Sequence, residues 1–150
     1  ERLMRRHDAE RRYVALVRGR VERDSFTIDA PLGRRAARIV IDRVEGRRAE
    51  TRVDVRERCH GATLLDAAPR TGRTHQIRVH LAAVGHPIVG DRAYGGAGQD
   101  ARRLGLARPF LHAWLLSFDH PLTGVMVRVE EPLPADLADA LARACSDQQP

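Results

Sequence analysis

The sequence predicts an α+β domain, in which short strands combine with a central helix and a closing C-terminal helix. After a charged, helix-compatible opening, residues 13–68 read as strands and turns, with apolar and polar residues alternating at 13–19 and 47–58. A stretch after residue 71 carries signals for both ends of a helix, and residues 133–144 place apolar and acidic residues at helical spacing. The 150 residues are 43% hydrophobic and 31% charged, which suits one globular domain, residues 1–150, but not two.

The strands are predicted from period-two alternation and from β-branched residues. The segment from Arg47 to Arg58 shows this best, because Ala49, Thr51, Val53 and Val55 alternate with polar and mostly charged residues. One face of that strand should be buried, and the other should be solvated or follow an RNA backbone. The other strand-like stretches are residues 13–19, 26–29, 38–42, 62–68, 109–118 and 125–129. Turns are predicted at Pro31–Gly33, Pro69–Gly72 and His120–Gly124.

The most distinctive stretch is Thr71–Gly96, which reads TGRTHQIRVHLAAVGHPIVGDRAYGG. Thr74 is the predicted N-cap of a helix, and Gly85 followed by Pro87 is the predicted C-terminal stop. Arg70 and Arg73 precede the helix N-terminus, an arrangement that suits a phosphate.

One arginine of this helix is placed unusually. Ile77, Leu81 and Val84 form an apolar stripe, and Arg78 lies about 100° round from Ile77, at the shoulder of the stripe. A guanidinium in that position is expected to be partly buried, so it needs an anionic or multi-acceptor partner.

Composition constrains the partners of the protein. The net charge is +6, the pI is about 10.7, and all 26 basic residues are arginines. The absence of lysine is consistent with a compositional bias of the source genome. The many arginines are also consistent with a polyanionic partner, because a guanidinium can donate two parallel hydrogen bonds to a phosphate. Both explanations stay open. No apolar run approaches the roughly 20 residues of a membrane span, and no signal peptide is apparent.

Cysteines and histidines give little support for a disulfide framework or a metal site. Cys59 and Cys145 are far apart and are expected to be reduced thiols of a cytoplasmic protein. His75 and His80 are five residues apart, so on a helix they point about 140° away from each other. A helical zinc site needs histidines four apart, and no metal is therefore expected.

The stretch Thr71–Gly96 resembles, nearly residue for residue, a motif of the large-subunit (RluA-type) family of RNA pseudouridine synthases. That motif runs Thr-Gly-Arg-Thr-His-Gln-Ile-Arg-Val-His-Leu, then Gly-His-Pro-Ile, Gly-Asp and Tyr-Gly, and all of it is present. The segments Arg12–Gly19, Leu111–Ala113 and His120–Gly124 are similar to further family segments. The resemblance extends from Arg12 to about Leu141.

The resemblance implies a catalytic domain with a mixed, mostly antiparallel sheet and packed helices, here missing its first third. Its expected activity is the isomerisation of uridine to pseudouridine in RNA, ribosomal RNA first and transfer RNA second, on a base flipped into the pocket. The reaction involves neither redox change nor hydrolysis, so no cofactor and no metal is expected. A cytoplasmic monomer is expected, as the downstream part of a longer protein, because the chain opens on Glu1 without an initiator methionine.

The resemblance also suggests roles for individual residues. Tyr13 would stack on the uracil and assist the final deprotonation at C5, although without the resemblance it reads as an ordinary strand aromatic. Arg78 would keep an aspartate ionised that family members carry upstream in a His-Arg-Leu-Asp segment, and no such segment occurs in these 150 residues. The candidates for phosphate and sugar contacts are Arg70, Arg73, His75 and Arg92.

Two alternatives stay open. His112 and His120 could be general bases, but structural placement at a strand end or turn is the preferred interpretation. The whole chain could also be a basic RNA-binding module without catalytic activity.

Overall fold

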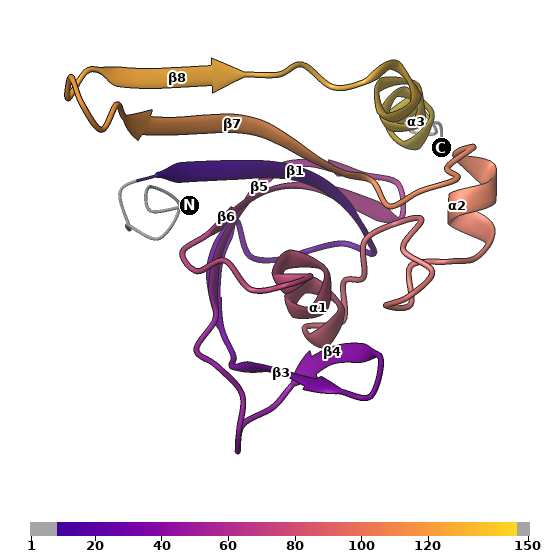
Figure 1. Ribbon diagram of the computed structural model, residues 1–150. Helices are drawn as coiled ribbons and strands as arrows, with labels where there is room; N and C mark the ends of the chain where they lie inside the picture. Colours follow the sequence, from indigo (N-terminus) through magenta and orange to yellow (C-terminus); the bar gives the residue numbers. More distant parts are fainter. Residues whose placement is uncertain (1–8, 147–150) are drawn as a thin grey trace.

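The computed structural model describes residues 9–146, and its main feature is a strongly curved six-stranded sheet (Figure 1). The strand order is β2-β5-β6-β1-β7-β8. A mixed, mostly antiparallel sheet was expected; its antiparallel character is confirmed, and every neighbouring pair in these six strands is antiparallel. The strands are β1 (Glu10–Arg18), β2 (Ser25–Asp29), β5 (Glu50–Cys59), β6 (Ala62–Pro69), β7 (Leu111–Asp119) and β8 (Met126–Glu130). All six coincide closely with stretches predicted from alternation.

A separate two-stranded hairpin, β3 (Leu32–Arg35) and β4 (Arg38–Ile41), lies beyond the main sheet. The predicted turn at Pro31–Gly33 is wrong, because Leu32 and Gly33 pair with Ile41 and Val40. The chain reverses after Arg35 instead, where Ala36 has a positive φ of 52°. The strand forms here because Leu32 is buried in a small second core, and this packing favours an extended segment over a turn.

The two faces of the sheet have different neighbours. Tyr13 on β1 lies opposite Ala67 on β6, which in turn lies opposite Val53 on β5. Side chains in one such row point to the same face of a sheet. Val53 is fully buried, as predicted for the inner face of that strand, and Thr51 two residues away bonds to helix α1. The row that includes Tyr13 therefore faces α1.

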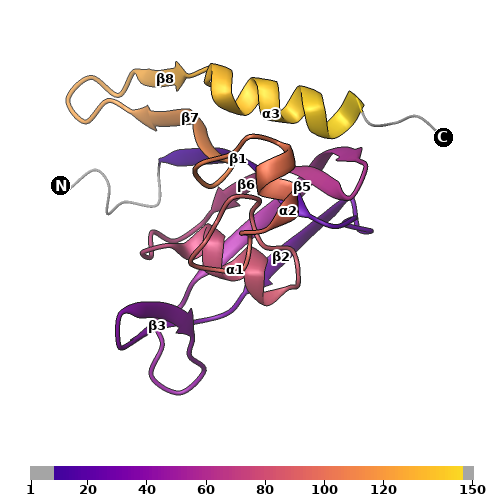
Figure 2. The same cartoon turned by 90° about the vertical axis from the view of Figure 1, so that its right-hand side faces the viewer.

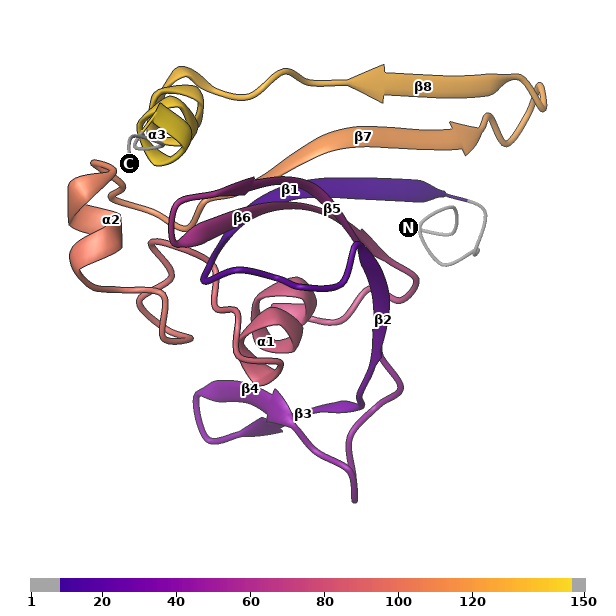
Figure 3. The same ribbon diagram turned by 180° about the vertical axis from the view of Figure 1, so that it is seen from behind.

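Helix α1 (Gln76–Ala83) lies in the hollow of the curved sheet, between it and the β3–β4 hairpin (Figures 1 and 3). Ile77 and Leu81 of the predicted stripe are buried in the main core. His80 is fully buried: its Nδ1 lies 2.9 Å from the Thr51 hydroxyl and its Nε2 2.9 Å from the Ala30 carbonyl. Because a carbonyl only accepts hydrogen bonds, Nε2 carries the proton, and His80 is a structural crosslink between helix and sheet.

The described residues contain two further helices, α2 (Gln99–Arg103) and α3 (Ala135–Ser146). Figure 2 shows α3 above the sheet and α1 below it. Leu137, Ala140 and Ala144 form the buried face of α3, as helical spacing predicted. No helix within residues 9–146 is long and apolar enough to cross a membrane.

The expectation of two reduced thiols is wrong for this structure, in which Cys59 and Cys145 form a disulfide with a Cα–Cα distance of 4.7 Å. The bond joins the end of β5 to the last turn of α3. The two residues are 86 positions apart, so sequence spacing gave no sign that the fold brings them together.

Candidate active site

The segment leading into α1 is held by a glutamine side chain rather than by a helix cap. The N-cap is His75, with a left-handed φ of 54° and no side-chain capping bond, so the prediction of Thr74 was wrong. Gln76 is buried, and its Oε1 accepts hydrogen bonds from the Thr71 hydroxyl at 2.6 Å and the Arg73 backbone N–H at 3.1 Å. Its Nε2 donates to the Glu50 carbonyl at 2.9 Å. Gln76 thus fixes this segment to β5, and the sequence offered only its position in the motif as a sign of this.

Within the described residues the anionic partner of Arg78 is Asp91, whereas the contact with an upstream aspartate that the resemblance suggests stays a prediction. Arg78 Nε donates to Asp91 Oδ2 at 2.7 Å, and Nη2 donates to Oδ1 at 2.8 Å. The Asp91 side chain is 1% exposed and that of Arg78 is 21% exposed. The prediction of a half-buried guanidinium with an anionic partner is confirmed, and the partner belongs to this chain.

The charges of this pair reinforce each other. Burial by itself would raise the pKa of Asp91, but the hydrogen bonds and charge of Arg78, with the backbone N–H groups of Ala93 and Tyr94, outweigh it and lower the pKa. The Asp91 hydrogen bond in turn raises the pKa of Arg78. Both groups are therefore charged at neutral pH.

Two aromatic rings complete the surroundings of the arginine. The Arg78 guanidinium carbon lies 4.9 Å from the centroid of the Tyr94 ring, a cation–π contact. The Tyr94 hydroxyl is 2.7 Å from His75 Nδ1. Burial and the charge of Arg78 lower the pKa of His75, which favours its neutral form. Asp91 and Tyr94 were missed as site residues, although the Gly-Asp and Tyr-Gly pairs of the motif pointed to their positions.

The turn that carries Asp91 is closed by glycines. The Gly90 N–H donates to the Gly96 carbonyl at 2.8 Å, and the Gly96 N–H donates to the Asp91 carbonyl at 2.7 Å. A Cβ on Gly96 would overlap the Ile88 carbonyl, so only glycine allows this approach. These contacts close the turn and place the Asp91 carboxylate within hydrogen-bond distance of Arg78.

Tyr13 is half-buried on the same face of the sheet as α1, packed against the main core. Arg11, two residues earlier on that face, reaches the exposed turn at Gly72, where its Nη atoms would lie 3.6 and 3.7 Å from an added Cβ. Its Nε is buried and has no hydrogen-bond partner within residues 9–146. The sequence gave no reason to single out Arg11.

The predicted RNA-contacting residues are all exposed, and they lie before α1 and on the turn after it: Arg70, Arg73, His75 and Arg92. Arg73 Nε also donates to the Arg48 carbonyl at 3.1 Å. The β3–β4 hairpin adds Arg38, whose Nη2 donates to the Ala93 carbonyl at 2.8 Å. The basic β3–β4 hairpin is thus hydrogen-bonded to the turn that carries Asp91.

His112 and His120 have structural roles, as preferred from the sequence. His112 Nε2 lies 2.9 Å from the Glu131 carbonyl, and His120 Nδ1 accepts from the backbone of Leu122 and Thr123 at 3.4 Å.

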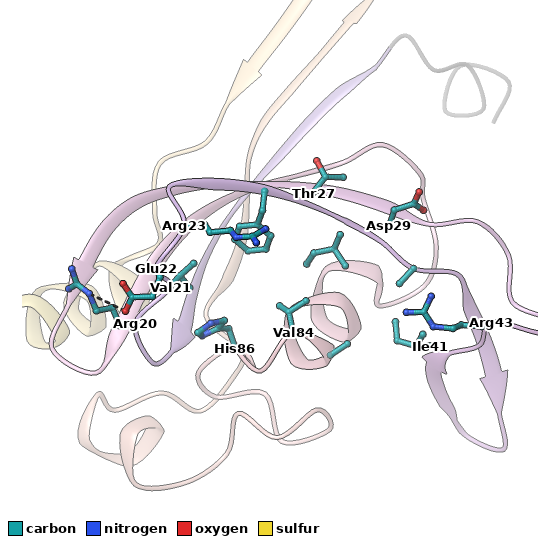
Figure 4. A pocket seen from close by; sticks show the side chains of 14 residues that line it. Arg20, Val21, Glu22, Arg23, Thr27, Asp29, Ile41, Arg43, Val84 and His86 are labelled. Atoms are coloured by element: carbon teal, nitrogen blue, oxygen red, sulfur yellow. Dashed lines mark ion pairs between the residues drawn. The ribbon is translucent and has the colours of Figure 1, made fainter.

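A groove of about 560 Å³ lies between β2 and the C-terminal end of α1 (Figure 4). Phe26, Ile41 and Val84 give it an apolar lining, and Arg23 and Arg43 are on its rim. Neither Arg78 nor Asp91 lines it, so it is distinct from the arginine site.

Comparisons with known proteins identify the family of the chain. A family model described as RNA pseudouridylate synthase matches residues 1–83, more than half of the chain. The chain belongs to the RNA pseudouridine synthase family. The resemblance noted from the motif is therefore confirmed.

Several curated relatives are similar along almost the whole chain. An RNA pseudouridine synthase of Mycobacterium bovis, named as uncharacterized, is 45% identical over 144 residues, which are 94% of this chain and 46% of that protein. Ribosomal large subunit pseudouridine synthase C of Pasteurella multocida is 41% identical over 92% of this chain and 44% of its own length. Synthase D of Nitrosomonas europaea is 40% identical over 93% and 42%. The chain thus spans less than half the length of these relatives.

Solved structures share the fold. Human RNA pseudouridylate synthase domain containing 1 superposes with a TM-score of 0.74 at 32% identity, over 89% of this chain and 58% of that one. Human RNA pseudouridylate synthase domain containing 4 gives a TM-score of 0.77 at 22% identity, which supports the fold alone.

Proposed function

We propose that the protein to which this chain belongs isomerises specific uridines of ribosomal RNA to pseudouridine, with transfer RNA as the second candidate substrate. Two relatives with about 40% identity are named as ribosomal large subunit synthases. The observation that carries the proposal is the oriented arginine, Arg78, fixed by Asp91 below and Tyr94 beside it.

The arginine has a nitrogen left for a second carboxylate. Arg78 uses Nε and Nη2 for Asp91, and Nη1 makes no hydrogen bond to any residue between 9 and 146. In our proposal Nη1 donates to an aspartate from a segment outside these 150 residues and keeps it ionised. Asp91 then orients the arginine instead of reacting itself.

Over the whole reaction the N1–C1′ and C5–H bonds break, and the C5–C1′ and N1–H bonds form. The aspartate either attacks C1′ or removes a proton from C2′ as the N1–C1′ bond breaks, and the freed uracil rotates. C5 then bonds to C1′ as the aspartate leaves C1′ or the proton returns to C2′, and loss of the C5 proton together with protonation of N1 completes the isomerisation. Tyr13 stacks on the base and assists removal of the C5 proton. Arg70, Arg73, His75 and Arg92 hold phosphate and sugar groups around the flipped nucleotide.

The proposal is tested by mapping pseudouridines in ribosomal and transfer RNA from a strain that lacks the gene. We expect particular sites to disappear and to return with the wild-type gene. Purified residues 1–150 should give no pseudouridine, because the proposed nucleophile lies outside them. Turnover by residues 1–150 would instead make Asp91 the first candidate for the reacting carboxylate.

A second candidate is a basic RNA-binding module without catalysis, for which the net charge of +6 and the exposed arginines before α1 are the supporting observations. The sequence of the full gene separates the two, since an upstream segment of that kind supports the enzyme. We also propose that the protein is a cytoplasmic monomer, which fractionation and gel filtration would test.

A further inference from the structure

A buried carboxylate lies on the opposite side of the sheet from Tyr13. Asp66 of β6 is 5% exposed and accepts hydrogen bonds from three other strands. Arg12 Nε donates to Oδ1 at 2.9 Å, Arg56 donates to Oδ2 through Nε at 3.1 Å and Nη2 at 2.6 Å, and Trp114 Nε1 donates to Oδ2 at 3.2 Å.

The donors also contact one another. The guanidinium carbon of Arg56 lies 4.6 Å from the Trp114 ring centroid, and that of Arg12 lies 5.9 Å from it. Both distances suit cation–π attraction. Four residues from β1, β5, β6 and β7 thus form one polar cluster, defined here as the Asp66 cluster.

The Asp66 cluster encloses a β-bulge. Arg12 lies opposite Leu115, but its neighbour Tyr13 lies opposite Ala113, so Trp114 is an extra residue in β7. Bulges locally bend a strand and redirect a side chain. The extra residue, Trp114, and the residue just before Tyr13 are both bonded to Asp66.

Arg12 and Tyr13 point to opposite faces because successive strand residues alternate. Asp66 lies opposite Val14, on the face that Arg12 shares, whereas Tyr13 lies opposite Ala67 on the α1 face. Because Arg12 is held on the Asp66 face of the sheet, the next residue, Tyr13, is held pointing to the α1 face. The anchor also holds the bulge at Trp114, since a one-residue shift of the β7 register would turn the β7 side chains beside Tyr13 to the opposite face.

We propose that Asp66 is a positioning residue for Tyr13: it anchors both sides of the bulge and so sets the orientation of the tyrosine toward the base. The inference rests on the proposed function, in which Tyr13 contacts the uracil. An apolar contact at position 66 would hold the strands together, but it would not fix the register through directed hydrogen bonds from Arg12 and Trp114.

A spectroscopic experiment tests the positioning step on this chain. The sequence contains two tyrosines, Tyr13 and Tyr94, so labelling with 3-fluorotyrosine gives two fluorine NMR signals, the second being an internal control. We expect Asp66→Asn and Trp114→Phe to shift or broaden the Tyr13 signal and leave that of Tyr94 unchanged. Trp114→Phe keeps an aromatic ring in contact with the Arg12 and Arg56 guanidinium groups and removes only the hydrogen bond to Asp66. This variant therefore tests the proposal even if Asp66→Asn does not fold.

Asp136→Asn is the matched control, because Asp136 accepts a two-pronged contact from Arg108 on the surface. It should leave both signals in place. An unchanged Tyr13 signal in Trp114→Phe, or equal changes at Tyr13 and Tyr94, would overturn the proposal, since the cluster would then have no specific effect on Tyr13.

Kinetics of the full-length enzyme give the second readout. Misplacement of a reacting group by about 1 Å costs on the order of a hundredfold, so we expect kcat to fall about 10- to 100-fold in Asp66→Asn with little change in KM for RNA. A rise in KM with kcat intact would overturn the positioning role. Full activity of Tyr13→Phe would instead contradict the proposed function, and the NMR result would still show whether Asp66 orients position 13.

Discussion

Arg78 and Asp91 are joined by two hydrogen bonds of 2.7 and 2.8 Å, between helix α1 and the glycine-closed turn that follows it. A planar guanidinium paired in this way cannot rotate without losing both bonds. The direction of its remaining nitrogen is therefore set before any substrate binds.

Replacement of Arg78 by alanine should abolish most of the activity of the full-length enzyme. It would remove the partner of the proposed catalytic aspartate and leave Asp91 as an unpaired buried carboxylate. Single-turnover rates should fall by orders of magnitude, since about 1.4 kcal/mol in the barrier is tenfold in rate. Arg78→Lys should rescue poorly because an ammonium cannot make the two-pronged contact. RNA affinity, measured on the same variants, should change little.

The same substitution should destabilise residues 1–150 by roughly 3–5 kcal/mol in urea unfolding, the usual cost of breaking a buried ion pair. Arg108→Ala is the matched control, because its two-pronged pair with Asp136 is exposed and screened by solvent, so its loss should cost far less stability. A near-normal rate with weakened RNA binding would place Arg78 on the RNA-binding surface instead.

RNA affinity should fall steeply with salt if the exposed arginines contact phosphates. Each lost contact should reduce the log–log slope by about 0.7–0.9. We expect this from Arg73→Ala and Arg70→Ala in binding titrations, with Arg128→Ala on β8 as the control. Affinity that does not depend on salt, or no binding at low salt, would contradict the proposed RNA-binding surface.

Stability should depend on the protonation of His80. Burial lowers the pKa of His80 below its ordinary value of 6.5, so the unfolded chain takes up the proton more readily than the folded one. Stability should therefore be fully present above pH 6.5 and fall as the pH drops below it. Thermal unfolding between pH 7.5 and 5 would measure this slope, and His80→Gln should flatten it. An unchanged slope in His80→Gln would show that other groups dominate.

The disulfide should be a major source of stability. It closes a loop of 86 residues, for which chain-entropy estimates give roughly 4 kcal/mol. Urea unfolding with and without dithiothreitol should differ by up to that amount. Cys59→Ala should be as stable as the reduced wild type, and dithiothreitol should not change its stability. Equal stability in both conditions for the wild type would mean that the bond adds nothing to the fold.

The sequence alone determined most of the secondary structure. Period-two alternation placed Thr51 and Val53 on the buried face of β5, and helical spacing placed Leu137 and Ala140 on the buried face of α3. It also determined that Arg78 is half-buried and needs an anion. These features follow from side-chain direction within one element, which is fixed by local backbone geometry.

Only the tertiary structure decided which residues meet. It paired Arg78 with Asp91 across 13 residues and Cys59 with Cys145 across 86, and it made Leu32 part of a strand where a turn was expected. It also gathered Arg12, Arg56 and Trp114, from three strands of the sheet, around Asp66 of a fourth. Such contacts depend on strand order and on the way loops close, which the pattern within a single element does not contain.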